Sequence, residues 1–265
     1  MNRYKKYVSS KLIKTKVLLQ NHSLIQYVPR TASLTSQRLL HMLNRYNMVY
    51  IKPVNGSLGI GVIKVEQIGS NYRYREDIQT YTFRTFHQMY DSIQRRIGSK
   101  PYLVQKGIIV LRHNNRPFDF RVMVQRNGEG TWDCTGVAAR LAHPKRAVTN
   151  GSQGGTIYAA EEILRKVTDQ AKAEEMVNQM RHIGLLTANQ FGSSYPAMNE
   201  LGLDVAVDRK HRLWILEVNT RPDPCPFTKL PDTTMIKTIV EYGKGYGRTY
   251  DLRCTKARKA KVNMI

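Results

Sequence analysis

Alternating apolar and polar residues predict β-strands in three parts of the chain. Around a glycine-rich segment, the runs VYIKPV (residues 49–54) and VIKV (62–65) predict a β-hairpin with a mobile tip. Between residues 102 and 142, polar turns separate three apolar runs, and Asn127-Gly128 is typical of a hairpin, so this part predicts an antiparallel meander. Residues 201–207 and 213–218 predict a last pair of strands.

Helical spacing of apolar residues predicts helices elsewhere. It is found in part of residues 1–30, after a Ser33 or Thr35 cap, in residues 87–97 and in residues 159–189. The alternation in residues 67–85 indicates strands rather than disorder. The chain shows no internal repeat, and this mixture of elements predicts an α+β protein.

The glycine-rich hairpin carries the first indication of chemistry. Glycines at positions 56, 59 and 61 leave backbone N–H groups open to anionic oxygens, and Lys52 adds a positive charge beside them. The spacing differs from a P-loop, in which the lysine follows the glycines, and from a dinucleotide fingerprint. By itself the stretch is typical of a surface hairpin, and a lid over nucleotide phosphates is the functional alternative.

The last pair of strands carries a candidate metal site. Glu217 and Asn219 are two residues apart, so they face the same side of a strand, and Asp204 lies opposite them on the preceding strand. Few oxygen ligands without histidine suit Mg²⁺ held jointly with a substrate phosphate. The alternative is solvated carboxylates and a turn-capping asparagine. We favour the metal site, because Glu217 follows the apolar run LWIL, where an unpaired charge is costly.

Further polar residues interrupt apolar strands. They are Gln105, Lys106, Asp119, Arg121 and Arg140. Each alone is typical of an outward-facing residue on a half-exposed sheet. Together they offer positive charges for phosphates, an acceptor for a ribose and a strand end whose backbone suits adenine.

Composition adds a strong positive charge. The chain has 42 Lys and Arg against 20 Asp and Glu, a net charge of +22, with no acidic residue before Glu66 and a basic stretch at residues 244–261. Such ends attract polyanions or form an ordinary solvated surface. Because no RNA-binding signature, helix-turn-helix or zinc spacing accompanies the charge, we favour an acidic peptide or anionic polymer over nucleic acid as partner.

Cysteines and apolar runs indicate the compartment. Cys134, Cys225 and Cys254 are far apart and lack CxxC spacing, which favours reduced thiols over a disulfide framework or a zinc site. The N-terminus has no signal-peptide core, and no apolar run has the length of a membrane span. We therefore expect a cytoplasmic protein.

The ordered motifs resemble the ATP-grasp superfamily, and over residues 33–227 they are most similar to its YheC/YheD-type endospore coat-associated branch. YIKPVNGSLGIGV, RPFDFRVMVQ, the NGSQGG loop and ELGLDVAVD with LEVNTRPDP carry this resemblance. It implies two α+β lobes with antiparallel sheets that hold ATP between them. It also implies a basic segment at 1–32, an ATP-grasp domain at 33–240 (lid subdomain 49–104, metal and phosphate subdomain 105–230) and a basic tail at 241–265.

The resemblance also implies a role for each site residue. ATP contacts are expected from Lys11, Lys52, Gly56, Ser57, Gly59, Gly61, Gln105, Lys106, Ile108 and Asp119, magnesium ligands from Asp204, Glu217 and Asn219, and catalytic charges from Arg121 and Arg140. Two departures stand out. Only about fifty residues precede the lysine hairpin, so a pre-ATP-grasp domain is expected to be short or absent. Gly202 stands where many relatives have an arginine, for which Arg140 or Arg146 is the expected substitute.

The implied activity is that of a carboxylate–amine (or carboxylate–thiol) ligase that uses ATP and Mg²⁺ and passes through an acyl phosphate, in sporulation or the cell envelope. The alternative is a non-catalytic ATP-binding protein of spore-coat assembly, with spore-coat proteins as partners. A kinase-like phosphotransferase fits less well, because an HRD-like catalytic loop is absent from the sequence. The donor and acceptor substrates are not indicated.

Overall fold

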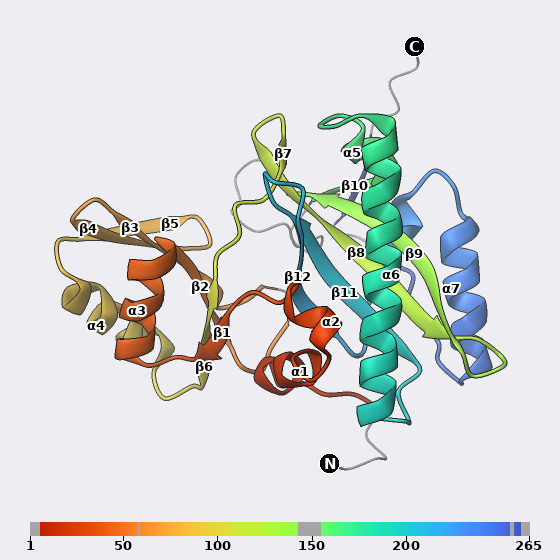
Figure 1. Ribbon diagram of the computed structural model, residues 1–265, viewed down its shortest axis with the longest axis horizontal. Helices are drawn as coiled ribbons and strands as arrows, with labels where there is room; N and C mark the ends of the chain where they lie inside the picture. Colours follow the sequence, from red (N-terminus) through yellow and green to blue (C-terminus); the bar gives the residue numbers. More distant parts are fainter. Residues whose placement is uncertain (1–5, 58, 143–154, 255–256, 261–265) are drawn as a thin grey trace.

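The computed structural model describes residues 6–57, 59–142, 155–254 and 257–260. Two sheets lie side by side, each covered by its own helices (Figure 1). Of the loop NGSQGG (residues 150–155), singled out in the sequence, only Gly155 is among the described residues. Arg146, also singled out, lies outside them. Among the described residues, no helix combines the length and the apolar composition that crossing a bilayer requires.

The first sheet is antiparallel and has six strands. In spatial order they are β1 (Thr31–Ser33), β6 (Tyr102–Lys106), β2 (Met48–Pro53), β3 (Ile63–Ile68), β4 (Asn71–Glu76) and β5 (Gln79–Phe83). Helices α3 (Ser36–Tyr46) and α4 (Phe86–Ile97) begin at the side-chain caps Thr35 and Thr85 and pack on one face. Strand alternation places Val49 and Ile51 in this core, whereas the intervening Tyr50 and Lys52 face the opposite side.

The second sheet has seven strands. Its order is β12 (Leu213–Asn219), β11 (Glu200–Val207), β8 (Arg116–Arg126), β9 (Trp132–Leu141), β10 (Thr156–Ala159) and β13 (Arg258–Lys259), and β7 (Arg112–His113) pairs with β8. One face carries α1 (Lys11–Leu18), α2 (His22–Ile25), α5 (Ala160–Leu164) and α6 (Gln170–Ser194). The 3₁₀ helix η2 (Cys225–Lys229) and helix α7 (Thr234–Gly245) pack on the other face (Figure 1).

The structure confirms the glycine hairpin, the helices at residues 36–46 and 86–97, and the last strand pair. The predicted meander is wrong, because β6 pairs with β1 and β2 of the first sheet and only β8 and β9 form a hairpin of the second. Alternation locates strands but does not say which sheet they join. The helix predicted at residues 159–189 is two helices, and Asp169 caps the start of the second.

The prediction of reduced thiols is wrong for two of the three cysteines. Cys225 and Cys254 form a disulfide with their Cα atoms 5.3 Å apart, whereas Cys134 is free. Helix α7 returns the chain to η2, so residues far apart in sequence meet in space. Burial raises the pKa of the Cys134 thiol to about 11, so this cysteine is a poor nucleophile at neutral pH.

Candidate nucleotide site

A cleft of about 1450 Å³ lies between the two sheets. It is lined by the open face of the first sheet, by the ends of β8, β11 and β12, by α1 and by the loop after β12. The predicted site residues that line it are Lys11, Lys52, Ser57, Gly59, Gln105, Lys106, Ile108, Asp119, Arg121, Arg140, Asp204, Glu217 and Asn219. Gly56 and Gly61 belong to the adjoining hairpin tip and are not among the lining residues.

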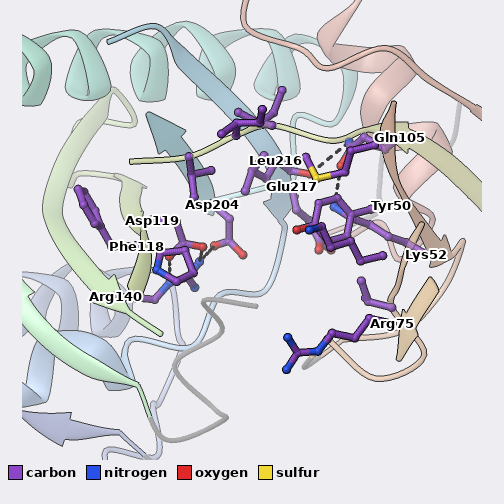
Figure 2. A pocket seen from close by; sticks show the side chains of 18 of the residues that line it. Tyr50, Lys52, Arg75, Gln105, Phe118, Asp119, Arg140, Asp204, Leu216 and Glu217 are labelled. Atoms are coloured by element: carbon purple, nitrogen blue, oxygen red, sulfur yellow. Dashed lines mark hydrogen bonds and ion pairs between the residues drawn. The ribbon is translucent and has the colours of Figure 1, made fainter. Parts of the chain in front are cut away.

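Lys52 is held at the floor of the cleft. Its Nζ donates a hydrogen bond to Gln105 Oε1 at 2.6 Å, and Gln105 Nε2 in turn donates to Thr31 Oγ1 at 3.2 Å. Burial lowers the pKa of the Lys52 amine, and the nearby carboxylate of Glu217 acts in the opposite direction. The lysine is therefore a positioned cation on the side of the cleft that faces Glu217 (Figure 2).

The glycine tip adopts backbone conformations that favour glycine. Gly56, Gly59 and Gly61 have φ angles of 129°, 72° and 71°. A Cβ at Gly61 would lie 2.8 Å from the Tyr102 hydroxyl oxygen. The tip is tied to α1, because Lys11 Nζ donates to the Gly56 carbonyl at 2.7 Å.

The connection after β6 forms an apolar shelf with a cation beside it. Lys106 Nζ lies 4.6 Å from the ring centroid of Trp214, and Ile108 packs with Ala206 and Trp214. Gly107 makes this connection possible, since a Cβ there would lie 2.9 Å from the Met48 carbonyl oxygen. Ile108 and the neighbouring Leu216 line the cleft, whereas Ala206 and Trp214 are buried. Apolar side chains beside a strand end suit a flat aromatic base.

Cross-strand pairing brings the arginines and aspartates of the cleft together. Asp119 is opposite Arg140, and Arg121 is opposite Asp204. Arg140 donates to both oxygens of Asp119 at 2.7 and 2.8 Å and lies 3.2 Å from Asp204 Oδ1 (Figure 2). Arg121 Nε donates to Asp204 Oδ1 at 2.9 Å. Burial raises the pKa of Asp204, but the guanidinium groups of Arg121 and Arg140 outweigh it and lower that pKa.

The three predicted magnesium ligands lie where β11 pairs with β12. Asp204 is directly opposite Glu217, and Asn219 Nδ2 donates to the carbonyl of Gly202, its cross-strand partner, at 3.3 Å. Within the described part of the chain, no group of three or more His, Cys, Asp or Glu gathers as a metal site, so the set is two carboxylates and an amide.

These three side chains fit a hard cation. Asp204 Oδ1 accepts a hydrogen bond from Arg121 and pairs with Arg140, and Glu217 Oε1 lies 3.4 Å from Lys14 Nζ. The side-chain nitrogen of Asn219, not its oxygen, makes the hydrogen bond to the Gly202 carbonyl. Among contacts between described residues, Asp204 Oδ2, Glu217 Oε2 and Asn219 Oδ1 make no hydrogen bond. Three such oxygens, completed by phosphate and water, are a donor set suited to Mg²⁺.

Lys14 is a residue that sequence reasoning missed. It is only 6% exposed, its Nζ lies 3.4 Å from Glu217 Oε1, and Lys11 Nζ lies 3.6 Å from the same oxygen. Burial lowers the pKa of the Lys14 amine, and Glu217 opposes that effect. The signal was present in the sequence, because residues three apart on a helix share one side.

Gly202 leaves room for Arg121. A Cβ at position 202 would lie 2.6 Å from Pro222 Cβ and 3.2 Å from a terminal nitrogen of Arg121. The expected substitutes for an arginine at this position were Arg140 and Arg146. Arg140 does reach Asp204, Arg146 is outside the described residues, and it is Arg121 that fills the space over the glycine.

The chain is similar to two curated proteins. The endospore coat-associated proteins YheD and YheC of Bacillus subtilis (strain 168) are 26% identical over 215 residues and 25% identical over 210 residues. These alignments cover 76% and 77% of this chain but 47% and 57% of the relatives, so the chain spans about half the length of the curated relatives it matches.

A solved structure shares the fold. The crystal structure of D-alanyl-alanine synthetase A from Vibrio cholerae O1 biovar eltor has 14% sequence identity and a TM-score of 0.51, and the match covers 89% of this chain and 60% of that one. The model of the YheC/D-like ATP-grasp family matches residues 4–249. The predicted ATP-grasp fold is thus confirmed, and the chain belongs to the YheC/D-like ATP-grasp family.

Proposed function

We propose that this protein binds ATP and Mg²⁺ in the cleft and joins a carboxylate to an amine or a thiol through an acyl phosphate. One observation carries the proposal. Lys52 and Lys106 from the first sheet and its connection face Asp204, Glu217 and Asn219 from the second across a single cleft. Family membership supports an ATP-grasp site, and the reaction and its substrates are our inference.

The nucleotide is placed by contacts of different kinds. Ile108 and Leu216, which belong to one apolar cluster and line the cleft, are proposed for the adenine. Lys52 and the backbone N–H groups of the glycine tip take the phosphates, and Lys106 adds charge beside the base. Asp119 is proposed for the ribose, where it would share oxygens that already accept hydrogen bonds from Arg140.

The metal and the arginines handle the reacting groups. Asp204, Glu217 and Asn219 would hold Mg²⁺, which would supply charge neutralisation for phosphoryl transfer. Arg121 is held in position by Asp204, and Arg140 by Asp119. Their guanidinium groups are proposed to stabilise negative charge on the oxygens of the carboxylate and of the transferred phosphoryl group.

The proposed reaction has two steps, phosphorylation of the carboxylate and attack on the acyl phosphate. A carboxylate oxygen of the substrate forms a bond to the γ-phosphorus while the bond from that phosphorus to the ADP oxygen breaks. The amine nitrogen (or thiolate sulfur) then bonds to the acyl carbon, phosphate leaves with the electron pair of the broken C–O bond, and an amine proton passes to solvent. Positioning and charge neutralisation supply most of the catalysis.

The test is binding and its dependence on Glu217. ATP with Mg²⁺ is expected to raise the melting temperature of the wild-type protein, and Glu217→Gln is expected to remove the part of that shift that requires Mg²⁺. Glu175→Gln is the matched control, because Glu175 is exposed on α6, pairs with Lys172 and is not among the residues that line the cleft. A wild-type melting temperature that ATP and Mg²⁺ leave unchanged would refute the proposal.

A second function is favoured by the charge pairing of the cleft. Glu217 is compensated by Lys11 and Lys14, and Asp204 by Arg121 and Arg140, so both carboxylates have cationic partners without a metal. This suits a protein that binds nucleotide without turnover and serves spore-coat assembly, as the names of the curated relatives suggest. Trapping of an acyl phosphate by hydroxylamine, with release of ADP, would exclude it.

A further inference from the structure

The cleft holds far more positive charge than a nucleotide requires. Thirteen lysines and arginines line it against five acidic residues, namely Glu66, Asp119, Asp204, Glu217 and Asp223. All five already accept hydrogen bonds or form ion pairs inside the protein. The volume of about 1450 Å³ also exceeds the roughly 300–1000 Å³ of an ordinary small-molecule pocket. The cleft thus has both room and charge for a second, anionic ligand.

The loop that follows Asn219 presents an arginine from a rigid base. Thr220 Oγ1 accepts from the Val8 backbone N–H at 2.9 Å and donates to the Val8 carbonyl at 3.0 Å. Arg248 donates to the Pro222 carbonyl at 2.8 Å, and the disulfide fixes the loop at Cys225. Backbone anchors therefore stand on both sides of Arg221.

The side chain of Arg221 is the exception in this fixed loop. It is exposed, it lines the cleft, and among the described residues it has no hydrogen-bond or ion-pair partner. A preorganised backbone with an unengaged guanidinium is the arrangement expected of a ligand contact, because little ordering remains to be done on binding.

The disulfide adds a second arginine to the same wall. Arg253 is adjacent to Cys254, and the bond to Cys225 brings it beside the loop that carries Arg221. Arg253 is 87% exposed and keeps one terminal nitrogen beyond its pair with Asp251. From the first sheet, Arg75 reaches into the cavity (Figure 2).

We infer that Arg221 and Arg253, with Arg75 opposite, form a subsite for an acidic peptide whose carboxylates flank the reacting group. This rests on the proposed function, because a ligase that activates a carboxylate already requires a carboxylate-bearing substrate. The planar fork of Arg221 matches a carboxylate bidentately, and Arg253 adds its remaining terminal nitrogen. A peptide with several acidic side chains places one carboxylate at Arg121 and its neighbours at the wall.

The probe is a short fluorescent oligo-glutamate, with binding followed by anisotropy in the presence of Mg²⁺ and a non-hydrolysable ATP analogue. Arg221→Gln and Arg253→Gln are each expected to weaken binding about two- to fivefold, as expected for exposed charge pairs, and the double variant about tenfold. The control is Arg95→Gln, which removes the same charge from the exposed face of α4, away from the cleft.

Several results would overturn the inference. Oligo-glutamate that does not bind, equal weakening by Arg95→Gln, or tighter binding of a polyphosphate or an oligonucleotide of equal charge would each do so. The shift of the melting temperature with ATP and Mg²⁺ distinguishes a wrong subsite from a wrong proposed function. If the nucleotide shift persists without peptide binding, only the subsite is wrong, and if the shift is absent, the proposed function fails first.

Discussion

The buried pair of Arg140 and Asp119 offers the sharpest test of what holds the cleft together. The side chains of Arg140 and Asp119 are 3% and 5% exposed, and two hydrogen bonds at 2.7 and 2.8 Å join them. Replacing Arg140 with methionine keeps much of its bulk but removes the two hydrogen bonds and the ion pair that Arg140 gives to the buried Asp119. Breaking such a pair from one side costs about 3–5 kcal/mol of unfolding free energy.

The geometry sets the size of this effect. Arg140 also lies 3.2 Å from Asp204 Oδ1, but Arg121 remains to compensate Asp204, so the loss stems mainly from Asp119. Replacing both partners, as in Arg140→Met with Asp119→Leu, removes the buried charge and is expected to recover most of the loss. The control Arg212→Met breaks the pair with Asp208, in which the arginine is 60% exposed, and is expected to cost less than about 1 kcal/mol.

Urea denaturation followed by circular dichroism measures these differences. The lowered pKa of Asp204 adds a pH dependence. Its stabilisation is present above the unfolded carboxyl pKa, about 3.9, and is lost as the pH falls through the lower folded pKa. The part of the gap between wild type and Arg140→Met that comes from the contact of Arg140 with Asp204 is therefore lost in acid. A loss under about 1 kcal/mol for Arg140→Met, or a double variant less stable than the single one, would refute the reasoning.

Three further variants test other features. Reduction of the disulfide, or Cys254→Ser, is expected to lower the unfolding free energy by about 2–4 kcal/mol, and equal urea midpoints with and without reductant would contradict this. Gly202→Ala is expected to cost about 1–3 kcal/mol and to weaken ATP binding, because the new methyl group meets Pro222 and Arg121, whereas tight binding at full stability would exclude that crowding. Gly107→Ala is expected to destabilise similarly against the Met48 carbonyl, while Gly128→Ala, with open space around it, serves as control; equal melting temperatures would contradict the clash.

Local patterns in the sequence predicted most elements and the pairing that matters most for the site. Side chains alternate along a strand and oppose one another across a pair of strands. The spacing of Glu217 and Asn219 therefore predicted that they share a face, and the position of Asp204 predicted that it lies opposite them, as the register confirms for Glu217. The assignment of β6 to the first sheet could not be foretold, because sheet membership is decided by long-range packing.

Other features depend on contacts between distant parts of the chain. The partners of Asp119 and Asp204 follow from the register of β8 with β9 and β11, which no single strand reveals. The disulfide depends on the return of the chain through α7. The contact of Lys14 with Glu217 depends on the packing of α1 against β12. The roles assigned to individual site residues remain predictions.

Helix α1 has a consequence for how charge is handled when ligands come and go. Lys11 bridges the two lobes, since its Nζ contacts the Gly56 carbonyl of the hairpin tip and lies 3.6 Å from Glu217 Oε1. In the structure the lysines of α1 are the counter-ions of this carboxylate. Under the proposed function they would pass to phosphate oxygens while Glu217 would pass to the cation. Such an exchange of partners would leave every charge paired before and after, so the site would avoid the cost of an isolated buried ion in either state.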